Sequence, residues 1–180
     1  MKNSYAAVAV TLLVLLGGFG FAAGPANPDV PENLKVPAGE KLVLKAHAKG
    51  VQIYVCQNAE QKLAWTLKAP EAELAEEGGK TIIHHSAGPS WKHVDGSEVT
   101  GKLVAKHDAP NGNAIPWLLL SAATHNGNGV LTKVSTIQRI HTEGGLAPKP
   151  ETCHASSSGQ ESKSDYAADY YFYAPANSAP

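Results

Sequence analysis

The chain has 180 residues, of which 17% are charged, and its 15 basic and 16 acidic residues leave a formal net charge of −1. This low and balanced charge excludes a nucleic-acid-binding protein, a coiled coil and a strongly charged disordered tail. The 17 glycines and 12 prolines favour a small globular domain that is rich in turns.

The first residues have the pattern of a secretory signal peptide. Lys2 precedes an apolar stretch from Ala6 to Phe21, which ends at a pair of alanines. We therefore predict a signal peptide at 1–23 and a secreted or periplasmic protein of roughly 155 residues, the size of one domain, with no transmembrane span after cleavage. An uncleaved membrane anchor is the alternative, although the most apolar part is short for a span of about 20 residues.

Two cysteines, Cys56 and Cys153, lie outside this segment. In an oxidising compartment an isolated pair usually bonds, so we predict a disulfide that closes a loop of about 97 residues and stabilises the fold. Two buried thiols or a metal site are the alternatives, but no CxxC spacing supports metal binding.

Four prolines between residues 24 and 39 predict an extended lead-in to the domain. Alternating apolar residues then predict three short strands, within Lys41–His47, Val51–Val55 and Leu63–Leu67. The second of these carries its three β-branched residues on one face. The segment 70–79, PEAELAEEGG, suits either one short helix or an irregular connection, because it has a proline at a helix start and a glycine stop.

Two hairpins and an aromatic strand follow. The hairpins pair Trp91–Val94 with Ser97–Lys106 around Asp95-Gly96, and Trp117–Thr124 with Val130–Ile140 around the Asn-Gly repeats of residues 126–129. The aromatic strand is Tyr166–Tyr173. These elements predict a single all-β domain over 40–175, an antiparallel β-sandwich or β-barrel built from hairpins with at most one short helix. A disordered tail is expected at 176–180.

Long, ordered motifs carry a family resemblance. They include Tyr54-Val-Cys56, His85-x-Ala-Gly-Pro89-x-Trp91, Asp95-Gly96-Ser97, Ile115-Pro-Trp-Leu-Leu-Leu120, Ile137-Gln-Arg139 and Tyr166-x-Ala-x-Tyr-x-Phe-Tyr173. Over residues 30–175 the chain resembles the family called domain of unknown function 3455. The resemblance implies a secreted protein of a bacterial or fungal type, with no activity attached to the fold. One departure is His84, where the family usually has glycine.

Eight histidines raise the question of metal binding, because imidazole is a ligand of zinc and copper. The densest group is His84, His85, His93 and Asp95, but neighbouring residues on a strand face opposite ways and no HxH or HExxH spacing occurs. We expect no metal and no other cofactor, and only one of His84 and His85 facing inward. His85 is the histidine most tied to function, because it lies within the segment HSAGPSW.

The same segment raises a catalytic hypothesis, in which His85 and Asp95 act with Ser90 or Ser97 as base, orienter and nucleophile. No strand–elbow–helix motif such as GxSxG supports it. The favoured interpretation is a structural turn in which Asp95 bonds to the backbone of its own hairpin.

Arg139 is the only arginine, beside fourteen lysines. Its planar donors match a carboxylate in a bidentate way that lysine cannot reproduce. We favour an internal ion pair with Asp95, Glu143 or Asp169, and an anionic ligand is the alternative.

The tryptophans bear on ligand type, since exposed indole rings stack on sugars. Trp65 and Trp117 are expected in the core, and Trp91 fits either role. The sequence favours a non-catalytic binding or envelope-surface module for a small molecule or glycan, of undefined oligomeric state. The alternative is a small secreted enzyme such as a metal-dependent hydrolase. For both functions the candidate residues are His85, Trp91, Asp95, Ser97 and Arg139.

Overall fold

The computed structural model describes residues 27–178, and the predicted signal peptide lies outside them. The described chain is all β, with eight strands and three short 3-10 turns. The strands are β1 (Glu40–Ala59), β2 (Lys62–Ala75), β3 (Thr81–Ser86), β4 (Ser90–His93), β5 (Glu98–His107), β6 (Trp117–Asn126), β7 (Thr136–Gly144) and β8 (Glu161–Pro175). The turns are η1 (Glu32–Leu34), η2 (Pro150–Thr152) and η3 (Ala155–Ser157).

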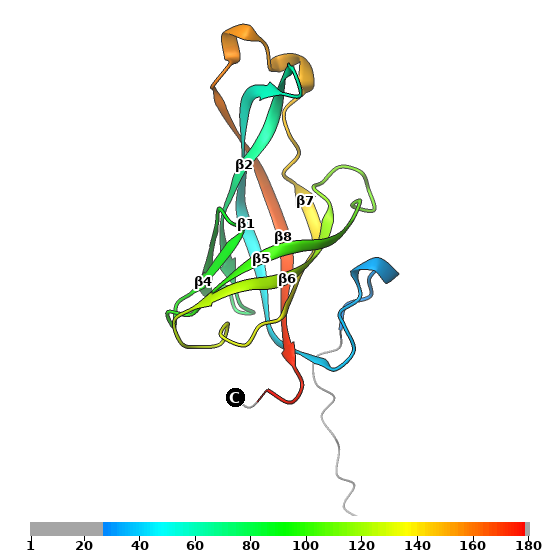
Figure 1. Ribbon diagram of the computed structural model, residues 1–180, viewed down its shortest axis with the longest axis vertical. Helices are drawn as coiled ribbons and strands as arrows, with labels where there is room; N and C mark the ends of the chain where they lie inside the picture. Colours follow the sequence, from blue (N-terminus) through cyan, green and yellow to red (C-terminus); the bar gives the residue numbers. More distant parts are fainter. Residues whose placement is uncertain (1–26, 179–180) are drawn as a thin grey trace, which may run out of the picture.

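Each strand pairs antiparallel with the next, and β8 pairs with β1, so the sheet closes into a barrel (Figure 1). Of the two architectures that the sequence predicts, the barrel is therefore the one that forms. No helix in residues 27–178 has the length and apolar character needed to cross a membrane.

β1 is one strand of 20 residues, so the prediction of two separate short strands in this region is wrong. Gly50 lies where β1 and β2 approach each other closely. A Cβ atom at this position would lie 2.1 Å from the carbonyl oxygen of Glu71 and 2.5 Å from the Cα of Ala72. Glycine inside a strand often marks such an approach of two backbones. Gly50, which in the sequence separates two predicted strands, instead allows β1 to continue beside β2.

Within residues 51–55 of β1, the face that carries the apolar side chains is less buried than the opposite face. The β-branched residues of the segment 51–55 are only partly buried, whereas the alternate residues Gln52 and Tyr54 are 1% and 8% exposed. The Tyr54 hydroxyl donates a hydrogen bond of 2.7 Å to the carbonyl of Gly145. Polar side chains thus enter the interior of the barrel from this strand.

The segment 70–79 does not form the helix, because β2 continues to Ala75, and only residues 76–79 form an irregular connection, a turn between β2 and β3. Its residues Ala72 and Leu74 are 4% and 0% exposed and belong to the interior core. Pairing with β1 and β3 gives this backbone hydrogen bonds along most of its length. An isolated helix of eight residues is only marginally stable by comparison.

The two predicted hairpins both form antiparallel pairs, β4 with β5 and β6 with β7. The second differs in its connection, because β7 begins at Thr136 and not at Val130. Leu131 and Val134 in this connection are 0% and 1% exposed and pack into the interior core. Because these two side chains are buried, the segment before β7 packs against the interior core as a turn. The tight Asn-Gly hairpin predicted here is therefore not formed.

The lead-in is packed against the outside of the barrel and contains η1, so it is not extended throughout. Leu34 is fully buried there, in an outer cluster with Ala109, Trp117, Leu119, Ile140, Tyr171 and Tyr173. The Gln138 side chain donates to the Leu34 carbonyl at 2.6 Å and accepts from the Tyr173 hydroxyl at 2.9 Å. At the other terminus, the Ala176 amide donates to the carbonyl of Gly39 at 2.7 Å.

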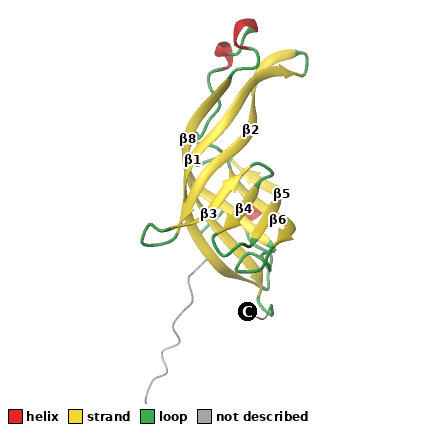
Figure 2. Cartoon of the chain, turned by 90° about the vertical axis from the view of Figure 1, so that its left-hand side faces the viewer, coloured by secondary structure: helices red, strands yellow, loops and turns green. Residues whose placement is uncertain are grey.

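The β1–β2 hairpin extends beyond the barrel together with the first part of β8, η2 and η3 (Figures 1 and 2). The predicted disulfide between Cys56 and Cys153 is confirmed and joins β1 to this region. Trp65 donates from its indole nitrogen to the Thr152 hydroxyl at 2.8 Å. Trp65 is therefore a half-buried residue of the extension and not a core residue, whereas Trp117 is 9% exposed, as expected for the core.

We expect the double variant Cys56→Ser/Cys153→Ser to lose about 2–4 kcal/mol of unfolding free energy, because the disulfide closes a long loop of the unfolded chain. Chemical denaturation of the oxidised wild type and the variant measures the difference. The variant should no longer respond to a reductant, which serves as the internal control. Equal stability of the two oxidised proteins would show that the bond does not stabilise the fold.

Candidate functional site

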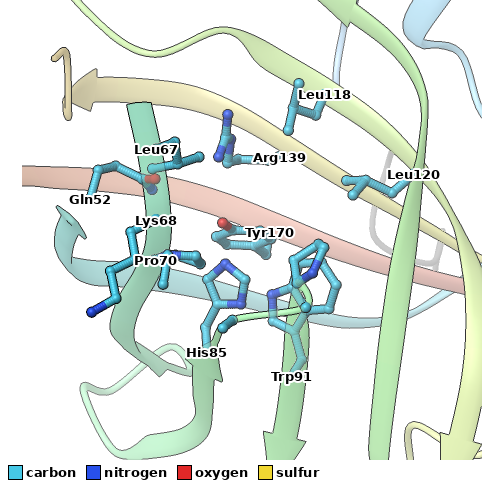
Figure 3. A pocket seen from close by; sticks show the side chains of 14 residues that line it. Gln52, Leu67, Lys68, Pro70, His85, Trp91, Leu118, Leu120, Arg139 and Tyr170 are labelled. Carbon is cyan, nitrogen blue, oxygen red and sulfur yellow. The ribbon is translucent and has the colours of Figure 1, made fainter. Parts of the chain in front are cut away.

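A cavity of about 280 Å³ lies in the barrel, between β2 and the β3–β4 turn on one side and β6 to β8 on the other (Figure 3). The exposed residues Leu67, Lys68 and Gly88 mark its rim. Its inner wall carries a mixture of apolar, aromatic and polar side chains. These are Gln52, Pro70, His85, Trp91, Leu118, Leu120, Arg139 and Tyr170.

Arg139 on β7 is half-buried at this wall and has no acidic partner among residues 27–178. Its Nη2 donates to the carbonyl of Pro116 at 2.8 Å, and its Nε is buried without a hydrogen bond. The carboxylates predicted as partners lie elsewhere: Asp169 pairs with two histidines, Asp95 lies in the β4–β5 turn, and Glu143 is exposed. The favoured ion pair is therefore wrong, and no described side chain neutralises this charge.

His85 on β3 is 2% exposed and is held in one orientation. Its ring stacks on Trp91 with centroids 4.6 Å apart and planes within 5°, and its edge contacts Tyr170. Its Nδ1 lies 2.8 Å from the carbonyl oxygen of Ser90. Because a carbonyl only accepts, Nδ1 carries the proton and Nε2 has a lone pair.

The same histidine is uncharged at neutral pH. Burial lowers the pKa of His85 to about 4; the hydrogen bond to Ser90 opposes this change, and the positive charge of Arg139 adds to it. A second positive charge beside Arg139 is thereby avoided.

Three more polar groups of the cavity residues are buried without a hydrogen-bond partner in the protein: the Gln52 Nε2, the Trp91 Nε1 and the Tyr170 hydroxyl. The Tyr170 hydroxyl interacts electrostatically with Arg139 and with the neighbouring Tyr166 hydroxyl, but makes no hydrogen bond of good geometry with either. Buried polar groups are nearly always paired, with protein, water or ligand. Both nitrogens donate, as does the guanidinium, so this set of groups is suited to an anion.

Asp95 and Ser97 lie away from the cavity, beyond the opposite end of β4. The amide and hydroxyl of Ser97 donate to Asp95 Oδ1 at 2.8 and 2.6 Å, and the Val130 amide donates to Oδ2 at 2.8 Å. The Leu131 amide donates to the Ser97 hydroxyl at 3.1 Å. The predicted bond from Asp95 to its own hairpin is confirmed, and the network also fastens the β6–β7 connection to the β4–β5 turn.

Residues 37–174 match the family model described as protein of unknown function, DUF3455. The chain belongs to this family. The match covers the barrel from before β1 to the last residues of β8, and the predicted resemblance is thereby confirmed. No curated protein and no solved structure matches the chain. The site of this DUF3455 domain must therefore be understood from its own geometry.

Three of the five predicted site residues of the DUF3455 barrel, His85, Trp91 and Arg139, line one cavity. Sequence reasoning did not single out Gln52 or Tyr170. The alternation in the aromatic strand identifies Tyr170, because it shares a face with other buried residues of β8. Gln52 has no such signal, since a polar residue between apolar ones in a strand ordinarily faces solvent.

The adjacent histidines His84 and His85 point to opposite faces of β3. His84 is exposed and its Nδ1 lies 2.8 Å from a carboxylate oxygen of Glu73, which confirms that only one of the two adjacent histidines faces inward. In the part of the chain that the structure describes, no three side chains of His, Cys, Asp or Glu gather as a metal site.

Asp95 gives a prediction on stability. Burial would raise the pKa of its carboxyl, but the hydrogen bonds from Ser97 and Val130 outweigh this and hold the pKa well below its usual value. The charged form is thus favoured in the folded protein, so its contribution is complete above the unfolded pKa of about 3.9 and is lost as pH falls below it. We expect Asp95→Asn to cost about 2 kcal/mol at pH 7.

Urea denaturation between pH 7 and pH 2 measures this contribution. The gap between the wild type and Asp95→Asn should narrow below about pH 4. Asp108→Asn is the matched control, because Asp108 is exposed and makes the same change of charge outside the network. If both variants are equally stable at pH 7, Asp95 does not hold the turn.

Proposed function

We propose that this DUF3455 protein is an exported, non-catalytic binding module whose barrel holds a small organic anion. The observation that carries the proposal is Arg139, a positively charged side chain in an interior cavity without an acidic residue beside it. Burying a charge is costly unless the charge is paired. A ligand of opposite charge provides the missing partner.

The shape of the cavity supports a small ligand. An eight-stranded barrel has an interior that side chains fill or that holds one small molecule. Here the space measures about 280 Å³, and an apolar cavity of about 150 Å³ already holds benzene. Leu118, Leu120 and Trp91 provide apolar contact beside Arg139. The ligand is therefore an organic acid with a compact apolar body.

The arrangement of polar groups supports binding over hydrolysis. The hydroxyl of Ser97 is engaged with Asp95 and the Leu131 amide, away from the cavity that contains His85. Ser97 is thus separate from the base His85, and the hydroxyl of Ser90, the other serine of the catalytic hypothesis, donates to a carboxylate oxygen of Glu98. Neither serine is paired with His85 as a nucleophile. Export is supported by the pattern of residues 1–23 together with the Cys56–Cys153 disulfide, a type of bond that persists in oxidising compartments.

Arg139→Gln tests the proposal, with benzoate and hexanoate as anionic probes and benzamide and hexanamide as neutral partners. We expect at least one acid to bind the wild type about tenfold or more tighter than its amide, because hydrogen bonds to charged groups are strong. Arg139→Gln should abolish this preference, and Arg139→Lys should keep only part of it. Calorimetric titration and the fluorescence of Trp91 at the cavity wall report binding.

Lys102→Gln is the matched control, since it removes one exposed positive charge outside the cavity. It should leave the preference for the acids unchanged. Equal affinity of the acids and amides for the wild type, or equal loss in both glutamine variants, contradicts the proposal.

A further inference from the structure

We propose that the ligand of this cavity is a monocyclic hydroxy acid, with its acidic group at Arg139 and its hydroxyl donating to Nε2 of His85. This inference rests on the proposed function, and it adds a second recognition element to the anion site. It comes from the fixed direction and tautomer of one buried ring.

His85 presents an acceptor and not a donor to the cavity. Its Nδ1 proton is committed to the Ser90 carbonyl at 2.8 Å. The ring cannot turn over without losing both this bond and its stacking on Trp91, where the ring planes are within 5° of parallel. Its remaining nitrogen, Nε2, makes no hydrogen bond within residues 27–178 and belongs to a residue that lines the cavity.

The other nitrogens at the cavity wall have the opposite character. Gln52 Nε2, Trp91 Nε1 and the Arg139 guanidinium all donate. Among the described side chains that line this cavity, His85 Nε2 is thus the one nitrogen that only accepts. A simple carboxylate satisfies the donors and leaves this lone pair without a proton to bind.

A hydroxyl group on the same ligand corrects that mismatch. In the proposed complex this hydroxyl donates to Nε2 of His85, while the acidic group accepts from Arg139, and both residues line the cavity. A site built to bind a polar substituent rejects the analogue that lacks it, because the buried group of the protein is then left unpaired. The histidine therefore selects among organic acids.

The size and lining of the cavity restrict the rest of the ligand. A volume of about 280 Å³ accommodates one ring with its substituents, given that benzene occupies a cavity of about 150 Å³. Leu118 and Leu120 on β6 and Pro70 on β2 contribute apolar contact. A hydroxybenzoate has these dimensions and both polar groups.

The test compares benzoate with its 2-, 3- and 4-hydroxy derivatives, so that the position of the hydroxyl varies around one ring. We expect at least one isomer to bind the wild type about three- to tenfold tighter than benzoate, the value of one neutral hydrogen bond. In His85→Phe, which retains a ring to stack on Trp91, this advantage should vanish, so that the variant binds the hydroxy isomer no more tightly than it binds benzoate.

An NMR measurement on the wild type keeps the inference testable if His85→Phe does not fold. Nitrogen chemical shifts of the His85 imidazole should show a proton on Nδ1 at pH 7. Addition of the preferred hydroxybenzoate should shift the Nε2 resonance, and benzoate should not. A proton on Nε2 of the free protein overturns the inference.

The outcomes separate this inference from the proposed function. If benzoate binds through Arg139 and no hydroxy isomer binds more tightly, the hydroxy acid is wrong and anion binding stands. If none of the four acids binds and Arg139→Gln changes nothing, both proposals fail, and water satisfies the polar groups of the cavity.

Discussion

Closure of the sheet by β1 is the constraint on which the rest of the structure depends. This strand pairs along most of its length with β2 on one side and with β8 on the other. Because successive side chains point to opposite faces of a strand, closure directs alternate side chains into the barrel and the others outward. The two buried clusters, one inside the ring and one beneath the lead-in, follow from this division.

The interior of the barrel is not apolar throughout, because a cavity with polar side chains adjoins the interior cluster. The cluster itself contains apolar and aromatic residues, but the neighbouring cavity holds a guanidinium, a neutral imidazole and an amide. Buried polar groups without partners destabilise a fold, and a protein tolerates them where they serve a function. The outer cluster around Leu34 and the disulfide at Cys56 stabilise the domain independently of the cavity. The barrel can therefore keep an interior that is shaped for binding.

Features with local signals were predictable from the sequence. The hairpin turn at Asp95-Gly96 and the aromatic strand follow from turn chemistry and alternation over a few residues. Continuation of β1 through Gly50, and of β2 beyond Pro70, depends on pairing with strands distant in sequence. No local pattern contains that information, and a glycine or a proline in isolation indicates a break.

The residues of the site likewise divide into those with a local signal in the sequence and those placed by strand pairing. His85 and Arg139 were identified from the sequence because each is unusual in its surroundings, one within an ordered motif and one as the only arginine. Grouping His85 with Asp95 relied on closeness in the chain, but β4 separates the β3–β4 turn at the cavity from the β4–β5 turn that contains Asp95. Gln52 enters the cavity only because closure turns its face of β1 inward.

The central claim is that Arg139 serves a ligand and not the fold, and Arg139→Met tests it most directly. The folding free energy of wild type and variant is measured by denaturation after both have been refolded without ligand. The account predicts that the variant is within about 1 kcal/mol of the wild type or more stable, because an uncompensated charge is replaced by an apolar side chain of similar length. A loss of about 3–5 kcal/mol, as expected when one member of a buried ion pair is removed, would contradict it.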